Sequence, residues 1–131
     1  MPVVTTLLAA VFALMLTGMS LAVSLRRREK AIARGDGDDD TLWRRMRAFR
    51  NFAEYAPMML IVLALVELSG APNRAVAALA GAFLLSRVLH AAGMYRRDGL
   101  AMRAAGMIVQ HLAFVAAACG LLWMLAAGGA A

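Results

Sequence analysis

Apolar residues fall into four long stretches along the chain, with short polar segments between them. The stretches cover residues 2–25, 52–68, 75–95 and 104–127. Residues 2–25 contain no charged side chain, and this stretch exceeds the ~20 residues that a helix needs to cross a bilayer. The second stretch carries Glu54 and Glu67 near its ends, and the third is interrupted by Arg87. The pattern predicts a single all-α domain over residues 1–131, an integral membrane bundle of four transmembrane helices.

The composition agrees with a membrane location. Hydrophobic residues make up 63% of the chain and the mean hydropathy is +0.70, whereas soluble domains are ~45–50% apolar. The single cysteine, Cys119, has no partner for a disulfide within the chain, and we expect it to be a small buried apolar residue of the fourth helix.

The placement of charge predicts the orientation of the bundle. Lysine and arginine cluster in and beside the first and third connections, whereas the second connection has only Arg74 beside it. Because basic residues favour the cytoplasmic side, we expect both termini outside and the first and third connections in the cytoplasm. Orientation and anionic lipid thus account for the net charge of +6, and no nucleic-acid partner is expected.

The first connection contains a short acidic run that could suggest a calcium loop. A calcium-binding EF-hand loop that began at Asp36 would need glycine at its sixth position and glutamate at its twelfth. Thr41 and Arg47 occupy those positions. We therefore expect no metal site but a polar turn, with Asp40 capping a helix that begins near Leu42.

A polar stripe enters the second apolar stretch. Arg47, Asn51 and Glu54 are spaced i, i+4 and i+7, so they share one face of a helix. Charged and amide groups at this depth are costly in lipid, and they mark a partner or a polar ligand.

With the predicted orientation, more polar residues lie in the same leaflet. They are Arg26, Arg87, His90, Tyr95, Arg103 and Gln110. Arginines bind carboxylates and a glutamate pairs with an amine, so the set suits a polyanionic ligand that also carries an ammonium group. Spacing alone leaves a second interpretation open, in which these residues pair only with one another and hold the bundle together. Arg87, about two turns inside a span, favours the ligand site. We expect Gln110 and His111 to make interhelical hydrogen bonds.

At these residues the chain resembles a known family, the membrane-associated proteins in eicosanoid and glutathione metabolism (MAPEG). The family motif R-A-x-x-N-x-x-E followed by proline matches Arg47, Ala48, Asn51, Glu54 and Pro57. A second signature, in the third helix, resembles residues 87–93, and the match covers nearly the whole chain.

The resemblance implies a homotrimer that binds glutathione as a co-substrate between neighbouring subunits. It implies that Arg47, Asn51, Glu54 and Tyr55 hold glutathione, with Arg87 and His90 nearby. Two further arginines are implied: Arg26 at a terminal carboxylate and Arg103 as the catalytic residue that stabilises the thiolate. Small residues in the third and fourth spans, such as Ala78, Ala80, Gly81 and Gly106, agree with close helix contact in such a trimer.

Two departures from the family pattern narrow the expected function. His90 stands where eicosanoid-type members have a tyrosine, and Met94 where they often have a second aromatic residue. The chain is therefore more similar to the small bacterial-type branch, in the inner membrane. The leading hypothesis is a glutathione-dependent transferase or peroxidase acting on lipophilic electrophiles. The alternatives are a non-catalytic glutathione-binding or scaffold protein of the same fold, and a small proton-coupled exporter. The exporter is disfavoured because the first span carries no acid.

Overall fold

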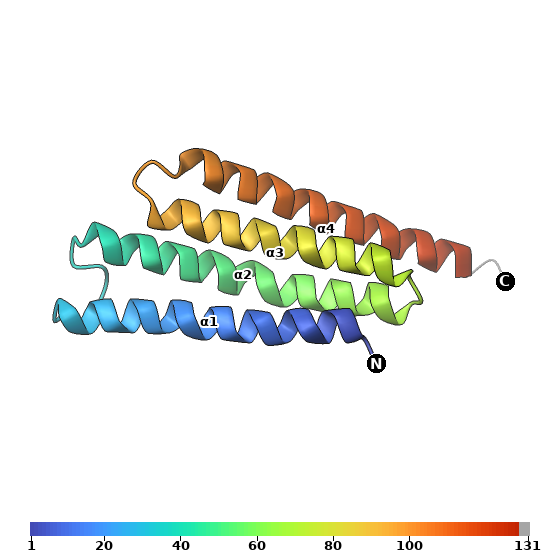
Figure 1. Ribbon diagram of the computed structural model, residues 1–131, viewed down its shortest axis with the longest axis horizontal. Coiled ribbons are helices and arrows are strands. Elements are labelled where there is room, and N and C mark those ends of the chain that lie inside the picture. Colours follow the sequence, from blue (N-terminus) through green and yellow to red (C-terminus); the bar gives the residue numbers. More distant parts are fainter. Residues whose placement is uncertain (129–131) are drawn as a thin grey trace.

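Four antiparallel helices make up the protein in the computed structural model, which describes residues 1–128 (Figure 1). The helices are α1 (Val3–Glu29), α2 (Asp40–Leu68), α3 (Asn73–Tyr95) and α4 (Leu100–Gly128). Each is long and apolar enough to cross a membrane, and no strand occurs among residues 1–128. The predicted all-α fold with four spans is therefore confirmed.

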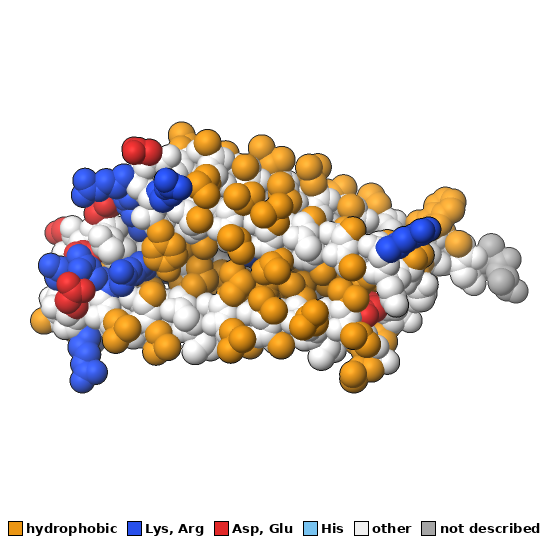
Figure 2. All heavy atoms as spheres, viewed as in Figure 1, with side chains coloured by type: hydrophobic (Ala, Val, Ile, Leu, Met, Phe, Trp, Pro, Cys, Tyr) orange, Lys and Arg blue, Asp and Glu red, His pale blue; other side chains and the backbone are white. Residues whose placement is uncertain are grey.

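The bundle has two unlike ends (Figure 1). The basic end carries the α1–α2 connection, residues 30–39, and the α3–α4 connection, residues 96–99. The turn end carries the α2–α3 connection, residues 69–72, together with the start of α1 and the end of α4. In Figure 2 nearly all charged side chains gather at the basic end, and apolar side chains cover the length between the ends. This distribution fits a bundle surrounded by lipid along its length.

At the basic end the helices run beyond the apolar stretches. Helix α2 begins at Asp40, many residues before its apolar part, and its N-cap is Asp39 rather than the predicted Asp40. The Asp39 carboxylate accepts a hydrogen bond from the Leu42 backbone N–H at 2.7 Å. Asp40 lies instead inside the first turn, where it forms an ion pair with Arg44 at 2.8 Å. The capping prediction was wrong by one residue because Asp39 has the extended backbone that an N-cap requires.

The core is built on one phenylalanine from each helix. The ring of Phe12 in α1 lies 5.2 Å from Phe52 in α2 and 5.8 Å from Phe83 in α3, centroid to centroid. Phe83 in turn lies 5.4 Å from Phe114 in α4 with an edge-on geometry. Because lipid removes the hydrophobic drive between helices, such close packing is what holds the bundle together.

Helices α3 and α4 make the most extensive contact, and Gly106 permits it. A Cβ atom at Gly106 would lie 2.8 Å from both the His90 backbone nitrogen and the Ser86 carbonyl oxygen. Gly106 therefore serves packing within one chain rather than the contact between subunits for which the sequence suggested it. At Gly81, by contrast, an added Cβ would meet no atom within 4 Å.

At the turn end, Glu67 of α2 caps the start of α1. Its carboxylate accepts hydrogen bonds from the backbone N–H of Val4 at 2.9 Å and of Thr5 at 2.8 Å, and from the Thr5 hydroxyl at 2.7 Å. Pro2, the N-cap of α1, supplies no side-chain hydrogen bond, so Glu67 satisfies N–H groups that the helix itself leaves unpaired. On α4, Cys119 is exposed, and the prediction that it is buried was wrong.

Candidate functional site

The centre of the predicted site is Arg87, which is 2% exposed in the core of the bundle. Its Nη1 donates to Asn51 Oδ1 at 2.6 Å and its Nε donates to Ser86 Oγ at 3.1 Å. The guanidinium carbon also lies 5.2 Å and 5.8 Å from the ring centroids of Phe83 and Tyr55. These contacts hold a buried cation with neutral groups and aromatic faces, and they tie α3 to α2.

The contact with Arg87 fixes the orientation of the Asn51 amide. Since the Asn51 oxygen accepts from a guanidinium, its NH₂ group must point the other way. That NH₂ group lies 3.8 Å from the sulfur of Met107 on α4, a weak acceptor. Asn51 therefore offers donors, and it suits a carbonyl or carboxylate oxygen of a ligand.

One face of α4 lies opposite Asn51 and includes Arg103. Arg103, Met107 and His111 are spaced four residues apart, so they share a face. Met107 contacts Asn51, and the ring of His111 lies 6.3 Å from that of Tyr55 on α2. Arg103 thus occupies the same face one turn nearer the basic end.

His90 lies among the arginines of this region. It is 9% exposed, and its backbone nitrogen lies so close to Gly106 of α4 that a Cβ there would come within 2.8 Å. Three residues later on α3, Gly93 lets the backbone and side chain of Arg103 pack closely against this helix. His90 and Arg103 thus both lie at the contact between α3 and α4.

The stripe on α2 divides into inward and outward residues. Asn51 and Tyr55 are partly buried and face α3 and α4, whereas Arg47 and Glu54 are exposed. The Arg47 guanidinium lies 6.0 Å from the Trp43 ring centroid. Glu54 forms no ion pair with any residue of the described range 1–128. Such an exposed carboxylate beside a membrane span is accessible to a group from outside the chain.

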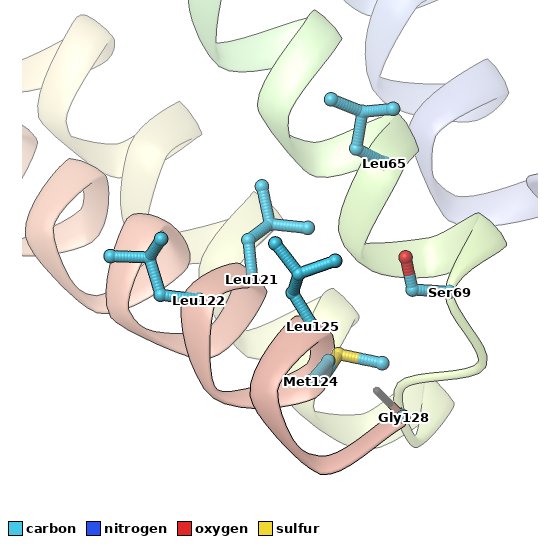
Figure 3. Close-up of a pocket in the computed structure, with 7 residues that line it drawn as sticks. All are labelled: Leu65, Ser69, Leu121, Leu122, Met124, Leu125 and Gly128. Carbon is cyan, nitrogen blue, oxygen red and sulfur yellow. The ribbon is translucent and has the colours of Figure 1, made fainter. Parts of the chain in front are cut away.

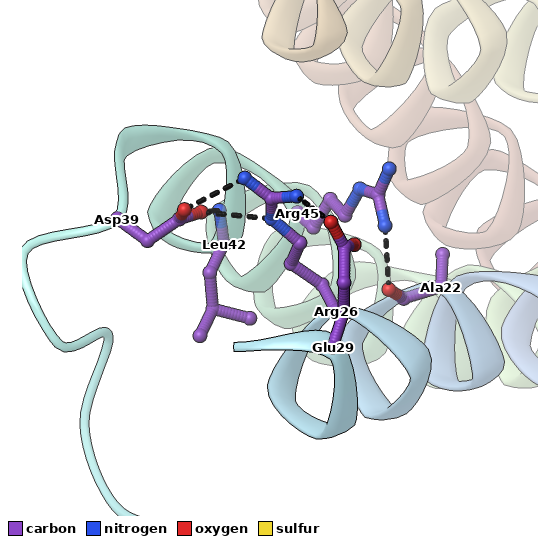
Figure 4. A network of polar contacts seen from close by, with 6 residues as sticks. All are labelled: Ala22, Arg26, Glu29, Asp39, Leu42 and Arg45. Carbon is purple, nitrogen blue, oxygen red and sulfur yellow. Dashed lines mark hydrogen bonds and ion pairs between the residues drawn. The ribbon is translucent and has the colours of Figure 1, made fainter. Parts of the chain in front are cut away.

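Arg26 belongs to a separate network in the first connection (Figure 4). Its Nε and Nη2 donate to the two carboxylate oxygens of Asp39 at 3.1 Å and 2.7 Å, and its Nη1 contacts Glu29 at 2.7 Å. Hydrogen bonds from Arg26, and a further one from the Leu42 N–H, hold the pKa of Asp39 below its usual 3.8. Within the single chain, Arg26 thus joins the end of α1 to the N-cap of α2. Its role in binding a terminal carboxylate of the ligand stays a prediction.

Beside Arg26, the same network contains Arg45, whose Nη1 donates to the Ala22 carbonyl at 2.9 Å (Figure 4). Arg45 therefore joins α2 to the last turns of α1. Together, Arg26 and Arg45 hold the start of α2, just before its polar stripe, against the end of α1.

Several residues of the site region were not identified from the sequence. Ser86 contacts Arg87, and Met107 contacts Asn51. In the sequence, Ser86 is indicated only by its place next to Arg87, and Met107 only by its place one turn from Arg103.

Gln110 is fully buried, and neither its oxygen nor its nitrogen has a partner within residues 1–128. The ring nitrogen Nδ1 of His111 contacts the Met107 carbonyl of its own helix at 2.6 Å. The interhelical hydrogen bonds expected of Gln110 and His111 are therefore absent from the described chain.

Large surface grooves occur at the other end of the bundle. One groove of about 540 Å³ lies between the ends of α2 and α4, where Leu65 and Ser69 face Leu121 and Leu125 (Figure 3). Its lining is mostly apolar, with Ser69 as the polar side chain. The polar cluster near the basic end and the apolar grooves near the turn end are thus separate features.

Comparison with known proteins shows the family to which the chain belongs. The profile of the MAPEG family matches residues 5–124. Similar proteins include the inner membrane protein YecN of Escherichia coli strain K12 and its counterpart in Escherichia coli O6:H1. Each is 28% identical over 122 residues, which cover 93% of this chain and 92% of the relative. The chain forms a bundle of four spans, carries the arginine, asparagine and glutamate stripe on α2, and matches the family profile over nearly its full length. It therefore belongs to the MAPEG family.

Proposed function

We propose that this protein binds glutathione at the polar cluster of α2, α3 and α4 and uses it as a co-substrate against lipophilic electrophiles in an inner membrane. The observation that carries the proposal is the exposed Glu54 carboxylate, without an ion pair in residues 1–128, beside an Asn51 amide that Arg87 orients. The similarity to an inner membrane protein and the arginines of the basic end support a cytoplasmic position for that end.

The chemistry of the residues fits the groups of glutathione. The tripeptide carries two carboxylates, one ammonium group, two amides and a thiol. Arg47 suits a carboxylate, the Asn51 NH₂ suits a carbonyl or carboxylate oxygen, and Glu54 suits the ammonium. Arg87 acts through Asn51, so it is a positioning residue rather than a direct ligand.

The exposure of Glu54 supports a site shared between copies of the chain. Glu54 and Arg47 are exposed, while Asn51 and Tyr55 face inward. A ligand that meets all four would lie at the edge of α2, where a neighbouring subunit can cover it. This arrangement supports the homotrimer that the family resemblance implies, with glutathione at each contact.

The proposed reaction is nucleophilic attack by the glutathione thiolate. Arg103 would lie beside the sulfur and favour the thiolate by charge pairing, so that the thiol proton is released to water. The sulfur then donates an electron pair to the electrophilic carbon, a C–S bond forms, and the leaving group departs with its bonding pair. An apolar electrophile can approach from the lipid.

Calorimetric titration with glutathione and thiolate absorbance in the near-ultraviolet test the two parts of the proposal. Wild-type protein should bind glutathione and show thiolate absorbance at neutral pH. Arg103→Leu should remove the absorbance and leave binding nearly unchanged, whereas Arg97→Leu in the exposed α3–α4 connection should change neither. Absence of binding contradicts the whole proposal. Binding without thiolate absorbance contradicts catalysis and supports the alternative of a non-catalytic glutathione-binding protein.

Asn51→Asp separates a ligand role from a packing role. The aspartate keeps an acceptor for Arg87, and the added charge strengthens that contact. It removes the NH₂ donors and repels carboxylates of the ligand. We expect the variant to fold at least as stably as the wild type and to lose glutathione binding. Retained binding would show that Asn51 serves only to hold α2 against α3.

A further inference from the structure

A second groove, of about 710 Å³, runs along α3 and α4 at the turn end. On α3 it is lined by alanines, among them Ala78 and Ala82, and on α4 it extends from Val109 to Met124. At 1.5 Å per residue this stretch of α4 is about 22 Å long, more than the ~15 Å of one leaflet's hydrocarbon. The groove is therefore long enough for an acyl chain that follows the helices from the turn end toward the bilayer centre.

A positive charge stands at the mouth of this groove. Arg74 is exposed in the first turn of α3, directly before the lining residue Ala75 and four residues before Ala78, so it lies beside the end of the groove. It is the only Lys or Arg between Arg50 and Arg87 in the sequence, and it lies at the level where lipid headgroups meet the bundle. A lone arginine in this position has the location and the charge to bind a lipid phosphate.

The start of α3 adds a second feature that attracts an anion. Its N-cap is Pro72, which supplies no side-chain hydrogen bond, and its first turn contains no acidic residue. The starts of α1 and α2 differ, since Glu67 caps the first and Asp39 the second. Arg74 also places a positive charge at the positive end of the α3 dipole, which is unfavourable until an anion binds there. The Ala75 N–H already bonds to the Pro72 carbonyl at 2.8 Å, so a phosphate would meet the N–H groups of Asn73 and Arg74 together with the arginine side chain.

A second copy of the chain cannot offer Arg74 an acidic side chain at this depth. Glu67 is the only Asp or Glu between Tyr55 and Arg97, and it already accepts three hydrogen bonds from the start of α1. The charge on Arg74 is thus better matched by lipid than by a neighbouring subunit.

We propose that one phospholipid binds here, with its phosphate at Arg74 and the start of α3 and one acyl chain in the α3–α4 groove. This site is independent of the proposed glutathione site, which lies toward the basic end.

Native mass spectrometry of the purified full-length protein with added phosphatidylglycerol tests the proposal. Wild-type protein should retain one phosphatidylglycerol per chain. Arg74→Gln should weaken retention by about fivefold, the effect expected for one arginine near an anionic lipid. Ala78→Leu should also reduce retention because it fills the groove. The matched controls are Ala77→Leu, one position away and outside the groove lining, and Arg97→Gln at the basic end; both should retain lipid like the wild type.

Trp123 gives a second, local measurement because it lines the groove. In a Trp43→Phe background, phosphatidylglycerol with brominated acyl chains in phosphatidylcholine vesicles should quench Trp123 emission in a saturable way. Arg74→Gln should raise the mole fraction for half-quenching about fivefold. Equal behaviour of Arg74→Gln and Arg97→Gln would overturn the proposal. Displacement of the lipid by inorganic phosphate alone would also overturn it. So would a loss of subunit association in Ala78→Leu with unchanged lipid retention, because a second copy of the chain would then fill the groove.

Discussion

Two glutamates on the same helix, Glu54 and Glu67, lie in opposite circumstances. Glu67 accepts three hydrogen bonds from the start of α1 and is part of the structure of the turn end. Glu54 is exposed near the basic end and forms no ion pair within residues 1–128. Both are carboxylates near a boundary of the same span, so residue type and depth do not distinguish them. Their contacts do: the hydrogen-bonded carboxylate of Glu67 stabilises the fold, whereas that of Glu54 is accessible, and we propose that it binds a ligand.

The same contrast extends to the two ends of the bundle. Near the basic end, Arg87 and Asn51 link α2 to α3 in the interior, and Arg103 and His90 lie close by. At the turn end Glu67 joins α2 to the start of α1, and the grooves between the helices are lined mainly by apolar side chains. The buried arginine and amide groups thus lie toward the basic end, and the apolar grooves lie toward the turn end.

The largest expected effect comes from removing the charge of Glu54 and, in a separate variant, the charge of Glu67. Glu54→Gln should weaken glutathione binding by about 2–5 kcal/mol, at least ~30-fold, because it removes the partner of a desolvated ammonium group. Glu67→Gln should leave the affinity unchanged. Calorimetric titration of both variants measures the difference. Equal losses of affinity in the two variants would mean that Glu54, like Glu67, acts through the fold.

The next effect concerns the packing of α3 on α4 beneath the polar cluster. Gly106→Ala should reduce the free energy of unfolding by about 1–3 kcal/mol, because the new Cβ meets backbone atoms of Ser86 and His90 that cannot move independently. Gly81→Ala is the matched control on the open face of α3 and should be neutral or stabilising. Unfolding in detergent monitored by circular dichroism compares the two. A neutral Gly106→Ala would show that the helices can separate at this point without loss.

A smaller effect is expected from the cap at the turn end. Glu67→Ala leaves the backbone N–H groups of Val4 and Thr5 without an acceptor, and it should lower Tm by a few degrees, as loss of a helix cap does. Glu54→Ala, with no partner to lose within the described chain, should leave Tm of the ligand-free protein unchanged. Thermal melts without glutathione test the pair, and an equal decrease in both variants would remove the distinction between the two carboxylates.

The smallest effect is a pH dependence at the basic end. The pKa of Asp39 is held below 3.8 in the folded protein, chiefly by Arg26. Its contribution to stability is therefore complete above the unfolded pKa of about 4 and is lost as the pH falls through the lower folded value. Asp39→Asn should flatten the decrease of Tm in this acidic range. Asp38→Asn, at an exposed position of the same connection, is the control and should follow the wild-type curve.

Much of the fold could be predicted because a bilayer leaves few choices. Four apolar stretches, each with its polar groups at the ends, can only become helices, and short connections make neighbours antiparallel. The same reasoning placed Arg87, Asn51 and Arg103 near one end. It placed the start of α2 near Leu42 with Asp40 as the cap, whereas the helix begins at Asp40 and Asp39 caps it, because the cap depends on the backbone conformation of each residue.

The sequence by itself determined the fold class, the gathering of arginines at one end and the residues of the α2 stripe, because these depend on hydropathy and helical spacing. Only the tertiary structure decided what each polar group does. It directed Arg87 onto Asn51, engaged Arg26 with Asp39 and Glu67 with the start of α1, and left Glu54 exposed. The physical reason is that a hydrogen bond depends on direction within a few ångströms across helices, and helical periodicity fixes a face but not the atom that faces it.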